Sequence, residues 1–375
     1  MRFIHTSDWH LGRILHGVSL LEDQVSLLSE IEKLVVDFRP ELLLISGDLY
    51  DRSIPPVDAI ETLDAFLTHL VIDRSVQAVI IPGNHDSAGR LSFASRLLES
   101  KGLHLAGSLE RMAALDFQDK HGKVTIFPIP YAVPAEIDGA SCHDDALAEQ
   151  VRRLRAGRKL SRSVALAHCF VAGGTVSESE RELCVGGSGQ VRKENFDSFS
   201  YAALGHLHAP QTISSEKIRY SGSLFKYSFS EAGHKKGVVC VDMDANGGVK
   251  AEFMPLRPKR DLRRLRGQFK DLLIGKGDSG SKSDYIEFTL LDRGPVLDAM
   301  GRLRETYPNA LHVRREADFW VPQEGPGKVD PARVDPVVLF SNFLKDTTNE
   351  PLSPKERPIF VEALKAALAS EEGVE

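Results

Sequence analysis

The sequence predicts an α/β protein in which residues 1–255 form a two-sheet sandwich, followed by smaller domains. Strand and helix patterns alternate near the N-terminus, as they do in parallel sheets. Alternating segments separated by turn residues then indicate a second sheet. After residue 256 the composition becomes more basic, which marks a change of domain. The 375 residues suffice for one large domain with smaller additions.

The N-terminal part has the order β-α-β-α-β. Apolar residues at helical spacing are ended by Pro40, and Pro55-Pro56 opens a second helix. Units of this kind form parallel sheets with right-handed crossovers, so the strands should all end at one edge, where open α/β sheets bind ligands. The strands are expected at 2–6, 41–46 and 76–81, and the first helix at 20–38.

The remainder of residues 1–255 is expected to complete the sandwich. An arginine-rich helix is predicted at 149–162. Residues 218–223 and 237–242 carry turn signals and alternate, so they are predicted as antiparallel strands of the second sheet. The other strands are expected at 124–130, 163–167 and 201–204.

Two smaller domains are predicted after the sandwich. Residues 256–325 should form a small α/β domain that begins with a basic helix at 260–274. Gly325-Pro326-Gly327 separates it from a helical hairpin at 331–375. The capping box Ser353-Pro354-Lys355-Glu356 begins the last helix. The apolar side of this hairpin either packs on its own domain or binds a partner.

Charge and cysteine content exclude several classes of protein. The net charge of −6 argues against a protein that coats nucleic acid by charge alone. No apolar run reaches the ~20 residues of a membrane span, so no membrane is expected as a partner. The four scattered cysteines predict neither disulfides nor a zinc knuckle, which fits a cytoplasmic protein.

Basic residues nevertheless gather in two clusters. Each cluster is either a solvated helix face or a phosphate-contacting patch. The first contains Arg152, Arg153, Arg155, Arg158, Lys159 and Arg162, and the second contains Arg257, Lys259, Arg260, Arg263, Arg264 and Arg266.

Residues that can bind metal follow the predicted strands. Gly83-Asn84-His85-Asp86 comes directly after the third strand. In extended chain, residues i and i+2 point the same way, so both side chains of a D-x-H or H-x-H pair can face one ion. Four further clusters stand at strand ends, namely Asp8-x-His10, Asp48, His168 and His206-x-His208.

Together these five clusters predict a dinuclear metal site. Taken singly, a strand-end Asp is more often a helix cap and a lone His is more often hydrogen-bonded, but five clusters in order favour a site. Carboxylates, an amide oxygen and imidazoles suit Mn²⁺ or Zn²⁺ better than Ca²⁺. Seven ligands are too many for one tetrahedral ion and suit two ions ~3.5–4 Å apart that share a carboxylate.

These motifs resemble two nested families. The calcineurin-like metallophosphoesterases are matched by Asp8-x-His10, Gly47-Asp48-x-x-Asp51, Gly83-Asn84-His85-Asp86, His168 and Gly205-His206-x-His208. Within them, the chain looks like SbcD, the bacterial family related to the Mre nucleases of double-strand-break repair. This narrower likeness rests on residues 5–12, 84–87, 177–181, 220–223 and 228–231. The fold it implies is a two-sheet α/β sandwich of the metallophosphoesterase type, with a small α/β capping domain and a C-terminal helical hairpin.

The resemblance also implies roles for the site residues. His85 matches a catalytic histidine that is not a metal ligand, and either Asp86 or Asp51 could orient it. Asp51 is not placed in the catalytic set. Two sets of Mn²⁺ ligands share Asp48 as a bridge, namely Asp8, His10, Asp48 and His208 for one ion and Asp48, Asn84, His168 and His206 for the other.

The partners implied by the resemblance are DNA and an ATPase. Residues 256–325 match a domain that holds DNA over the site. Residues 331–375 match a segment that docks on the coiled-coil base of an SbcC-like ATPase subunit. The family forms homodimers through helices of the nuclease domain, and its members are cytoplasmic and associated with the bacterial nucleoid.

Three functions are compatible with the sequence. The first is a Mn²⁺-dependent DNA nuclease, a double-strand exonuclease and single-strand endonuclease acting on DNA ends and hairpins together with an SbcC-like subunit. The second is a phosphoesterase for phosphomonoesters or cyclic nucleotides, which would leave the small domain and terminal helices without a purpose. The third is a non-catalytic DNA-end tether, and the intact His85 and seven ligands argue against it.

Overall fold

A computed structural model describes the chain over residues 1–158, 160–180, 183, 189–292 and 294–316, and at 337–338, 340–341, 344–345, 352–353 and 356–363. It divides into two compact units, Met1–Asp318 and Phe319–Glu375. Predictions made for Lys159, Arg181, Gly325-Pro326-Gly327 and much of 331–375 lie outside the described residues.

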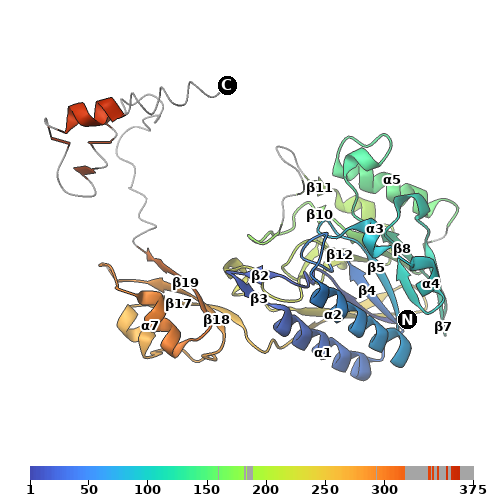
Figure 1. The fold of residues 1–375 in the computed structure, drawn as a ribbon. Helices are drawn as coiled ribbons and strands as arrows, with labels where there is room; N and C mark the ends of the chain where they lie inside the picture. Colours follow the sequence, from blue (N-terminus) through green and yellow to red (C-terminus); the bar gives the residue numbers. More distant parts are fainter. Residues whose placement is uncertain are drawn as a thin grey trace. The chain divides into compact units, whose positions relative to one another are not determined.

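The first unit is built on two six-stranded sheets, in agreement with the predicted sandwich (Figure 1). The first sheet has the order β16-β15-β1-β4-β5-β6, with β1 (Arg2–Thr6), β4 (Leu42–Ser46), β5 (Gln77–Ile81), β6 (Leu103–Leu105), β15 (Gly237–Met243) and β16 (Val249–Pro255). The second has the order β13-β14-β12-β9-β8-β7, with β7 (Leu115–Asp119), β8 (Gly122–Ile129), β9 (Ser163–His168), β12 (Tyr201–Gly205), β13 (Gln211–Ile213) and β14 (Ser215–Tyr220).

The N-terminal β-α-β-α-β order is confirmed. Strands β1, β4 and β5 pair in parallel, so their carboxyl ends meet at one edge. Helix α1 (Leu21–Phe38) ends at Arg39, whose φ of 52° is left-handed, immediately before Pro40. Helix α2 (Val57–Thr68) begins after Pro56. Proline has no amide hydrogen to donate, so it is tolerated in the first turn of a helix. A helix that approaches a proline from its N-terminal side ends before it.

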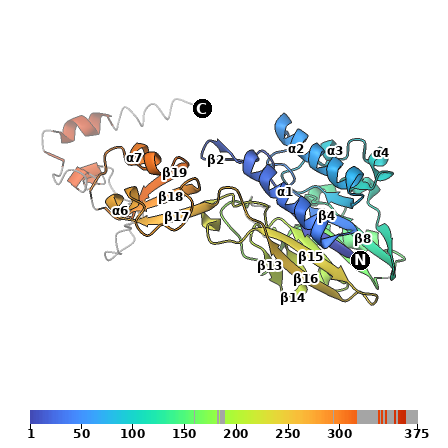
Figure 2. The same cartoon turned by 90° about the horizontal axis from the view of Figure 1, so that it is seen from below.

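Side chains of the central strands alternate between two cores. Leu42 and Leu44 of β4 lie in the core between the sheets, together with Leu166 of β9. Leu43 and Ile45 lie on the opposite face, in the core formed with helices α1 and α2. Figure 2 shows these helices gathered along one side, beside β4. Helix α5 (His143–Arg155) packs in the same way on the second sheet. A strand covered on both faces must be apolar throughout, which explains the continuous run in β4.

Shorter elements connect these layers. They are the two-residue strand pairs β2 (Ile14–Leu15) with β3 (Val18–Ser19) and β10 (Phe170–Val171) with β11 (Gln190–Val191), and the helices α3 (Ala88–Leu91) and α4 (Ser95–Glu99).

Three predicted elements differ from the structure. Strand β15 pairs antiparallel with β1 and so belongs to the first sheet, not the second. Alternation identifies a strand but not its neighbour, which tertiary pairing decides. The arginine-rich helix covers His143–Arg155 instead of 149–162. The basic helix at 260–274 is wrong, because β17 (Leu262–Gly267) is a strand and only α6 (Phe269–Leu273) is helical.

The small sheet after residue 256 contains β17, β18 (Tyr285–Leu290) and β19 (Ala310–Arg315) in parallel, with α6 and α7 (Ala299–Thr306) packed in its core. It belongs to the same compact unit as the sandwich. The buried Asp23 of α1 accepts hydrogen bonds from Arg260 Nη2 at 2.8 Å and from the Tyr285 hydroxyl at 2.8 Å. The predicted domain boundaries stay predictions.

Most of the described arginines in the two basic clusters are paired within the protein. Arg152 and Arg153 both bind Glu149, and the buried Arg162 binds Asp119 at 2.6 Å. In the second cluster, Arg263 binds Asp284 at 2.6 Å and Arg264 binds Glu287 at 2.7 Å. Arg152 and Arg153 lie on the exposed face of α5, as the solvated-helix interpretation expects, whereas Arg162 and Arg263 form ion pairs that are largely shielded from solvent.

The second unit contains the predicted capping box. The Ser353 amide donates to Glu356 Oε2 at 3.0 Å, and the Glu356 amide donates to Ser353 Oγ at 3.3 Å. The rings of Phe340 and Phe360 stack with centroids 4.1 Å apart. Among the described residues, no helix is both long and apolar enough to cross a membrane.

A buried histidine joins the two sheets. His5 of β1 donates through Nε2 to the Leu204 carbonyl at 3.1 Å and accepts at Nδ1 from the Tyr201 hydroxyl at 3.1 Å. Both nitrogens are thus satisfied in the neutral ring. Burial lowers the pKa of His5 from 6.5 to about 3.

We predict that His5 makes unfolding dependent on pH. Between pH 6.5 and 3 the unfolded chain binds a proton at His5 that the folded chain does not. The free energy of unfolding should therefore fall as the pH is lowered through this range, by up to ~1.4 kcal/mol per pH unit. The His5→Gln variant, compared with wild type by urea unfolding from pH 4.5 to 7.5, should show a flatter profile. The exposed His121→Gln serves as control, and parallel profiles for His5→Gln and wild type would contradict the prediction.

Candidate metal centre

All eight predicted site residues lie at or beside strand ends, and the structure brings them together. Loops after β1, β4 and β5 carry Asp8, Asp48 and Asn84, while the second sheet supplies its histidines at the ends of β9 and β12. The two sheets are joined directly, because His168 Nδ1 donates to the Ser46 carbonyl at 2.8 Å and the His206 amide donates to Asp8 Oδ1 at 3.0 Å. The site therefore spans the edges of both sheets.

The backbone at the site is left-handed at four residues that are not glycine. The φ angles are 52° at Asp8, 44° at His10, 52° at Asp48 and 105° at His206. Such conformations cost about 1–3 kcal/mol each and persist when their surroundings hold them. Here the amides of Asp8 and His10 each donate at 3.0 Å, to the carbonyls of Gly47 and Asp48. The β1 and β4 loops thus hold each other in place.

Two glycines allow the loops to approach this closely. A Cβ on Gly83 would lie 2.1 Å from Asp48 Oδ1, and one on Gly205 would lie 2.0 Å from the Ser46 carbonyl oxygen. Any larger residue at either position would push the β4 loop away from its neighbours.

Asp48 lies between the two groups of expected ligands. Its Oδ1 accepts from the His85 amide at 2.9 Å. Its Oδ2 is 3.5 Å from His168 Nε2 and 3.8 Å from His10 Nε2. Among the described residues, possible ligand atoms lie within 4.8 Å of one another in three groups, namely Asp8, His10 and His208; Asp8, Asp48 and His168; and His10, Asp51 and His85.

The facing atoms of His168 and Asn84 fit a cation. Because His168 Nδ1 donates to a carbonyl, its Nε2 bears a lone pair in the neutral ring. That nitrogen is 2.9 Å from Asn84 Oδ1, which is also an acceptor. Burial lowers the pKa of His168, which disfavours a proton between the two atoms. A metal ion is the group that two such acceptors can share.

His10 and His208 also bring two ring nitrogens face to face. His208 Nδ1 donates to Ser179 Oγ at 2.7 Å, because that hydroxyl itself donates to Glu231. The lone pair of His208 Nε2 then faces His10 Nε2 at 3.1 Å. The other ring nitrogen of His10, Nδ1, is buried without a hydrogen-bond partner among the described residues. Burial, followed by the neighbouring His208, lowers the pKa of His10.

The buried carboxylates of Asp8 and Asp48 would be stabilised by a nearby positive charge. Burial and then the nearby charge of Asp48 raise the pKa of Asp8 well above its usual value. Two buried carboxylates this close disfavour each other's ionised form, and a divalent ion removes that cost. The donor set, with its lone pairs directed inward, therefore fits metal ions.

Asp86 and Asp51 act through different atoms. The Asp86 carboxylate accepts from the amides of Gly83 at 3.0 Å, Leu49 at 3.1 Å and Tyr50 at 3.1 Å, so it joins the β4 and β5 loops. His85 Nδ1 donates to the main-chain carbonyl of Asp51 at 2.8 Å. The Asp51 carboxylate instead binds Arg13 at 2.7 Å. The group that orients His85 is thus a carbonyl, not either carboxylate.

Sequence reasoning assigned no role to the residues that support His208. Glu180 Oε1 accepts from the His208 amide at 2.7 Å. Glu231 is fully buried beside Ser179 and forms an ion pair with Lys236. Two short Ser- and Glu-rich stretches, 177–181 and 228–231, were the available signal, but nothing in them indicates that they meet.

A two-sheet sandwich whose strand ends gather Asp, Asn and His side chains that fit metal ions has the architecture of a metal-dependent phosphoesterase. A model described as calcineurin-like phosphoesterase matches residues 1–210, and one described as type 5 capsule protein repressor C-terminal domain matches 258–348. The SbcD subunit of the nuclease SbcCD from Staphylococcus epidermidis is 32% identical over 360 residues, covering 94% of this chain and 95% of that protein. The chain belongs to the calcineurin-like phosphoesterase family and, within it, to SbcD.

Two solved structures are more distantly similar. TT1561 of Thermus thermophilus is 12% identical with a TM-score of 0.40, over 67% of this chain and 98% of that one. A dimetal phosphatase from Danio rerio is 12% identical with a TM-score of 0.41, over 68% of this chain and 96% of that one. Likenesses of this size support no functional conclusion.

We predict that Ser179→Ala weakens metal binding. The change removes the acceptor that keeps the Nδ1 proton of His208 in place, and loss of such a support typically costs 10–100-fold in affinity. Titration of the metal-free protein with Mn²⁺, followed by calorimetry, measures the effect. Ser177→Ala is the matched control, because the buried Ser177 hydroxyl in the same loop has no hydrogen-bond partner among the described residues. Equal affinities for the two variants would contradict the prediction.

Proposed function

We propose that this protein is the nuclease subunit of an SbcCD-type complex and hydrolyses phosphodiesters at DNA ends and hairpins with two Mn²⁺ ions. The observation that carries the proposal is the position of Asp48, whose Oδ2 lies 3.8 Å from His10 Nε2 and 3.5 Å from His168 Nε2, while its Oδ1 accepts from the His85 amide. The similarity to a protein named as part of a nuclease supports the choice of DNA over small phosphoesters. A cytoplasmic location at the nucleoid is part of the proposal.

Each residue has a stated part in the proposed reaction. Bound divalent ions would lower the pKa of a water molecule and offset negative charge on the phosphate. One ion would be held by Asp8, His10, Asp48 and His208, and the other by Asp48, Asn84, His168 and His206.

His85 is the proposed proton or hydrogen-bond donor to the phosphate. Its Nδ1–H donates a hydrogen bond to the Asp51 carbonyl, which fixes the ring, and Nε2 is then the atom available to the substrate. The His85 amide is anchored separately on Asp48. Truncating the side chain therefore leaves the main-chain contact to Asp48 in place.

We predict that His85→Ala abolishes Mn²⁺-dependent degradation of linear duplex DNA while Mn²⁺ still binds. Loss of a general acid or base typically lowers the rate 10²–10⁴-fold. Gel assays of DNA degradation, alongside a Mn²⁺ titration of the same samples, separate the two effects. His121→Ala is the control, since it removes an exposed imidazole from a turn.

Other outcomes would favour the competing functions. Normal DNA digestion by His85→Ala would refute the mechanism. If the wild-type protein cleaves only a chromogenic diester and never DNA, a small-molecule phosphoesterase is favoured. Mn²⁺-dependent DNA binding without any hydrolysis would favour the non-catalytic tether.

The remaining segments are proposed to bind partners. We assign residues 256–325 to holding DNA over the site and residues 331–375 to docking on an SbcC-like coiled-coil ATPase subunit. A homodimer through helices of the nuclease domain, residues 1–255, completes the proposed assembly.

Deleting residues 331–375 should abolish co-purification with the ATPase subunit and leave Mn²⁺ affinity unchanged, because none of the metal-site residues lies in that segment. Pull-down of the co-expressed subunits and a Mn²⁺ titration test both parts. An intact complex after the deletion would remove the assignment of this segment.

A further inference from the structure

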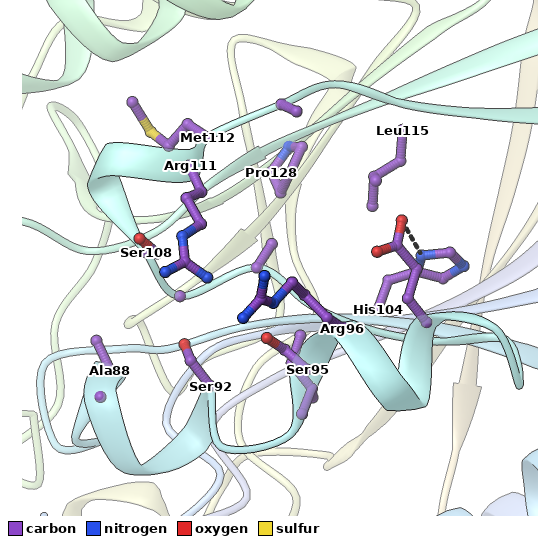
Figure 3. Close-up of a pocket in the computed structure, with 16 residues that line it drawn as sticks. Ala88, Ser92, Ser95, Arg96, His104, Ser108, Arg111, Met112, Leu115 and Pro128 are labelled. Atoms are coloured by element: carbon purple, nitrogen blue, oxygen red, sulfur yellow. Dashed lines mark ion pairs between the residues drawn. The ribbon is translucent and has the colours of Figure 1, made fainter.

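A pocket of about 490 Å³ lies between helices α3 and α4 and the segment that runs from His104 to Leu115 (Figure 3). It shares no residue with the candidate metal centre, although Ala88 at its rim follows Asp86 by two positions. Cavities of ~300–1,000 Å³ hold small organic ligands. This pocket is therefore large enough for one.

Two arginines and one carboxylate, that of Glu99, line the pocket, so its charged lining is net positive. Arg96 comes from α4 and Arg111 from the opposite wall, and Figure 3 shows both side chains reaching into the space between the walls. Within the part of the chain that the structure describes, no carboxylate lies within 4.0 Å of either guanidinium. Arginines elsewhere, such as Arg162 and Arg263, are paired with carboxylates. Two neighbouring guanidinium groups that bind no carboxylate of the protein suit a phosphate.

Hydroxyl groups surround the same end of the pocket. Ser92 Oγ is buried and has no hydrogen-bond partner among the described residues. Ser95 and Ser108 also line the pocket, and Figure 3 places Ser92 and Ser108 near the arginine side chains. Buried polar atoms in folded proteins almost always have partners, so an orphaned hydroxyl beside two cations indicates an absent acceptor.

The rest of the pocket has a different character. Leu105, Met112 and Leu115 supply apolar surface. His104 lies at the opposite end from Arg111 in Figure 3, and its Nδ1 is buried without a hydrogen-bond partner among the described residues. Glu99 pairs with this histidine at 4.0 Å. The cationic end matches a phosphate, and the opposite end, where Leu115 lies beside His104 in Figure 3, offers apolar surface and a polar atom to a base.

We propose that this pocket binds one nucleotide unit, with its phosphate between Arg96 and Arg111 and its base toward His104. The unit is either a free nucleoside monophosphate or one nucleotide of a DNA strand, which present the same chemistry. The proposal does not depend on the function proposed above.

Calorimetry of the full chain in EDTA tests the proposal, because chelation prevents phosphate from binding through metal ions. The titrants are dAMP, inorganic phosphate and a short single-stranded oligodeoxynucleotide. Arg96→Gln/Arg111→Gln should weaken dAMP binding at least about tenfold, since each charge-assisted hydrogen bond to phosphate contributes more than one factor of ten. Lys101→Gln/Lys120→Gln changes the net charge equally at exposed positions outside the pocket and should leave binding unchanged.

If dAMP binds and the oligonucleotide does not compete with it, the pocket is assigned to free nucleotides. If the oligonucleotide binds and the arginine substitutions weaken its binding, the pocket is assigned to a DNA strand. No saturable binding of either, or equal binding by the arginine variant, overturns the proposal. If inorganic phosphate binds as tightly as dAMP, the claim that the pocket recognises a nucleotide is overturned. If the arginine variant does not fold, Ala113→Phe fills the pocket from an exposed position and must weaken binding; unchanged affinity again overturns the proposal.

Discussion

The buried carboxylate of Asp48 is the group on which the arrangement of the site depends. Residues from three other loops are positioned against it, because it accepts the His85 amide and lies near the ring nitrogens of His10 and His168. Gly83 leaves room for this approach. Burial, and after it the charge of the same carboxylate, raise the pKa of Asp8, so without a cation the site is electrostatically unfavourable. Metal binding and the stability of this edge of the sandwich are therefore coupled.

The arginines of the protein are of two kinds, those that bind carboxylates of the protein and those that could bind an external anion. The clusters that are evident in the sequence largely bind carboxylates, as Arg260 does with the buried Asp23. Arg96 and Arg111 are isolated in the sequence, yet they converge across a pocket without a carboxylate partner among the described residues. Density of basic residues along the chain is thus a poor guide to anion binding, since the spacing of carboxylates in the fold decides which cations remain free.

Much of the site could be predicted because it follows from the sheet. Parallel strands deliver their carboxyl ends to one edge, so Asp8, Asp48 and Asn84 had to converge once β1, β4 and β5 were recognised. The support of His208 could not be predicted in this way. Ser179 and Glu231 come from loops more than fifty residues apart, and no local periodicity relates them. The strand β17 was also missed, because Leu262 and Leu265 stand at helical spacing within a run of arginines.

The sequence by itself determined the α/β alternation, the strand-end positions of the ligands and the family, because these depend on local periodicity and on short motifs. Only the tertiary structure decided that β15 joins the first sheet beside β1 and that the carbonyl of Asp51 accepts a hydrogen bond from His85 Nδ1. It also decided which ring nitrogens face inward. Those outcomes depend on hydrogen bonds between segments distant in sequence, whose geometry is fixed only when both sheets are packed.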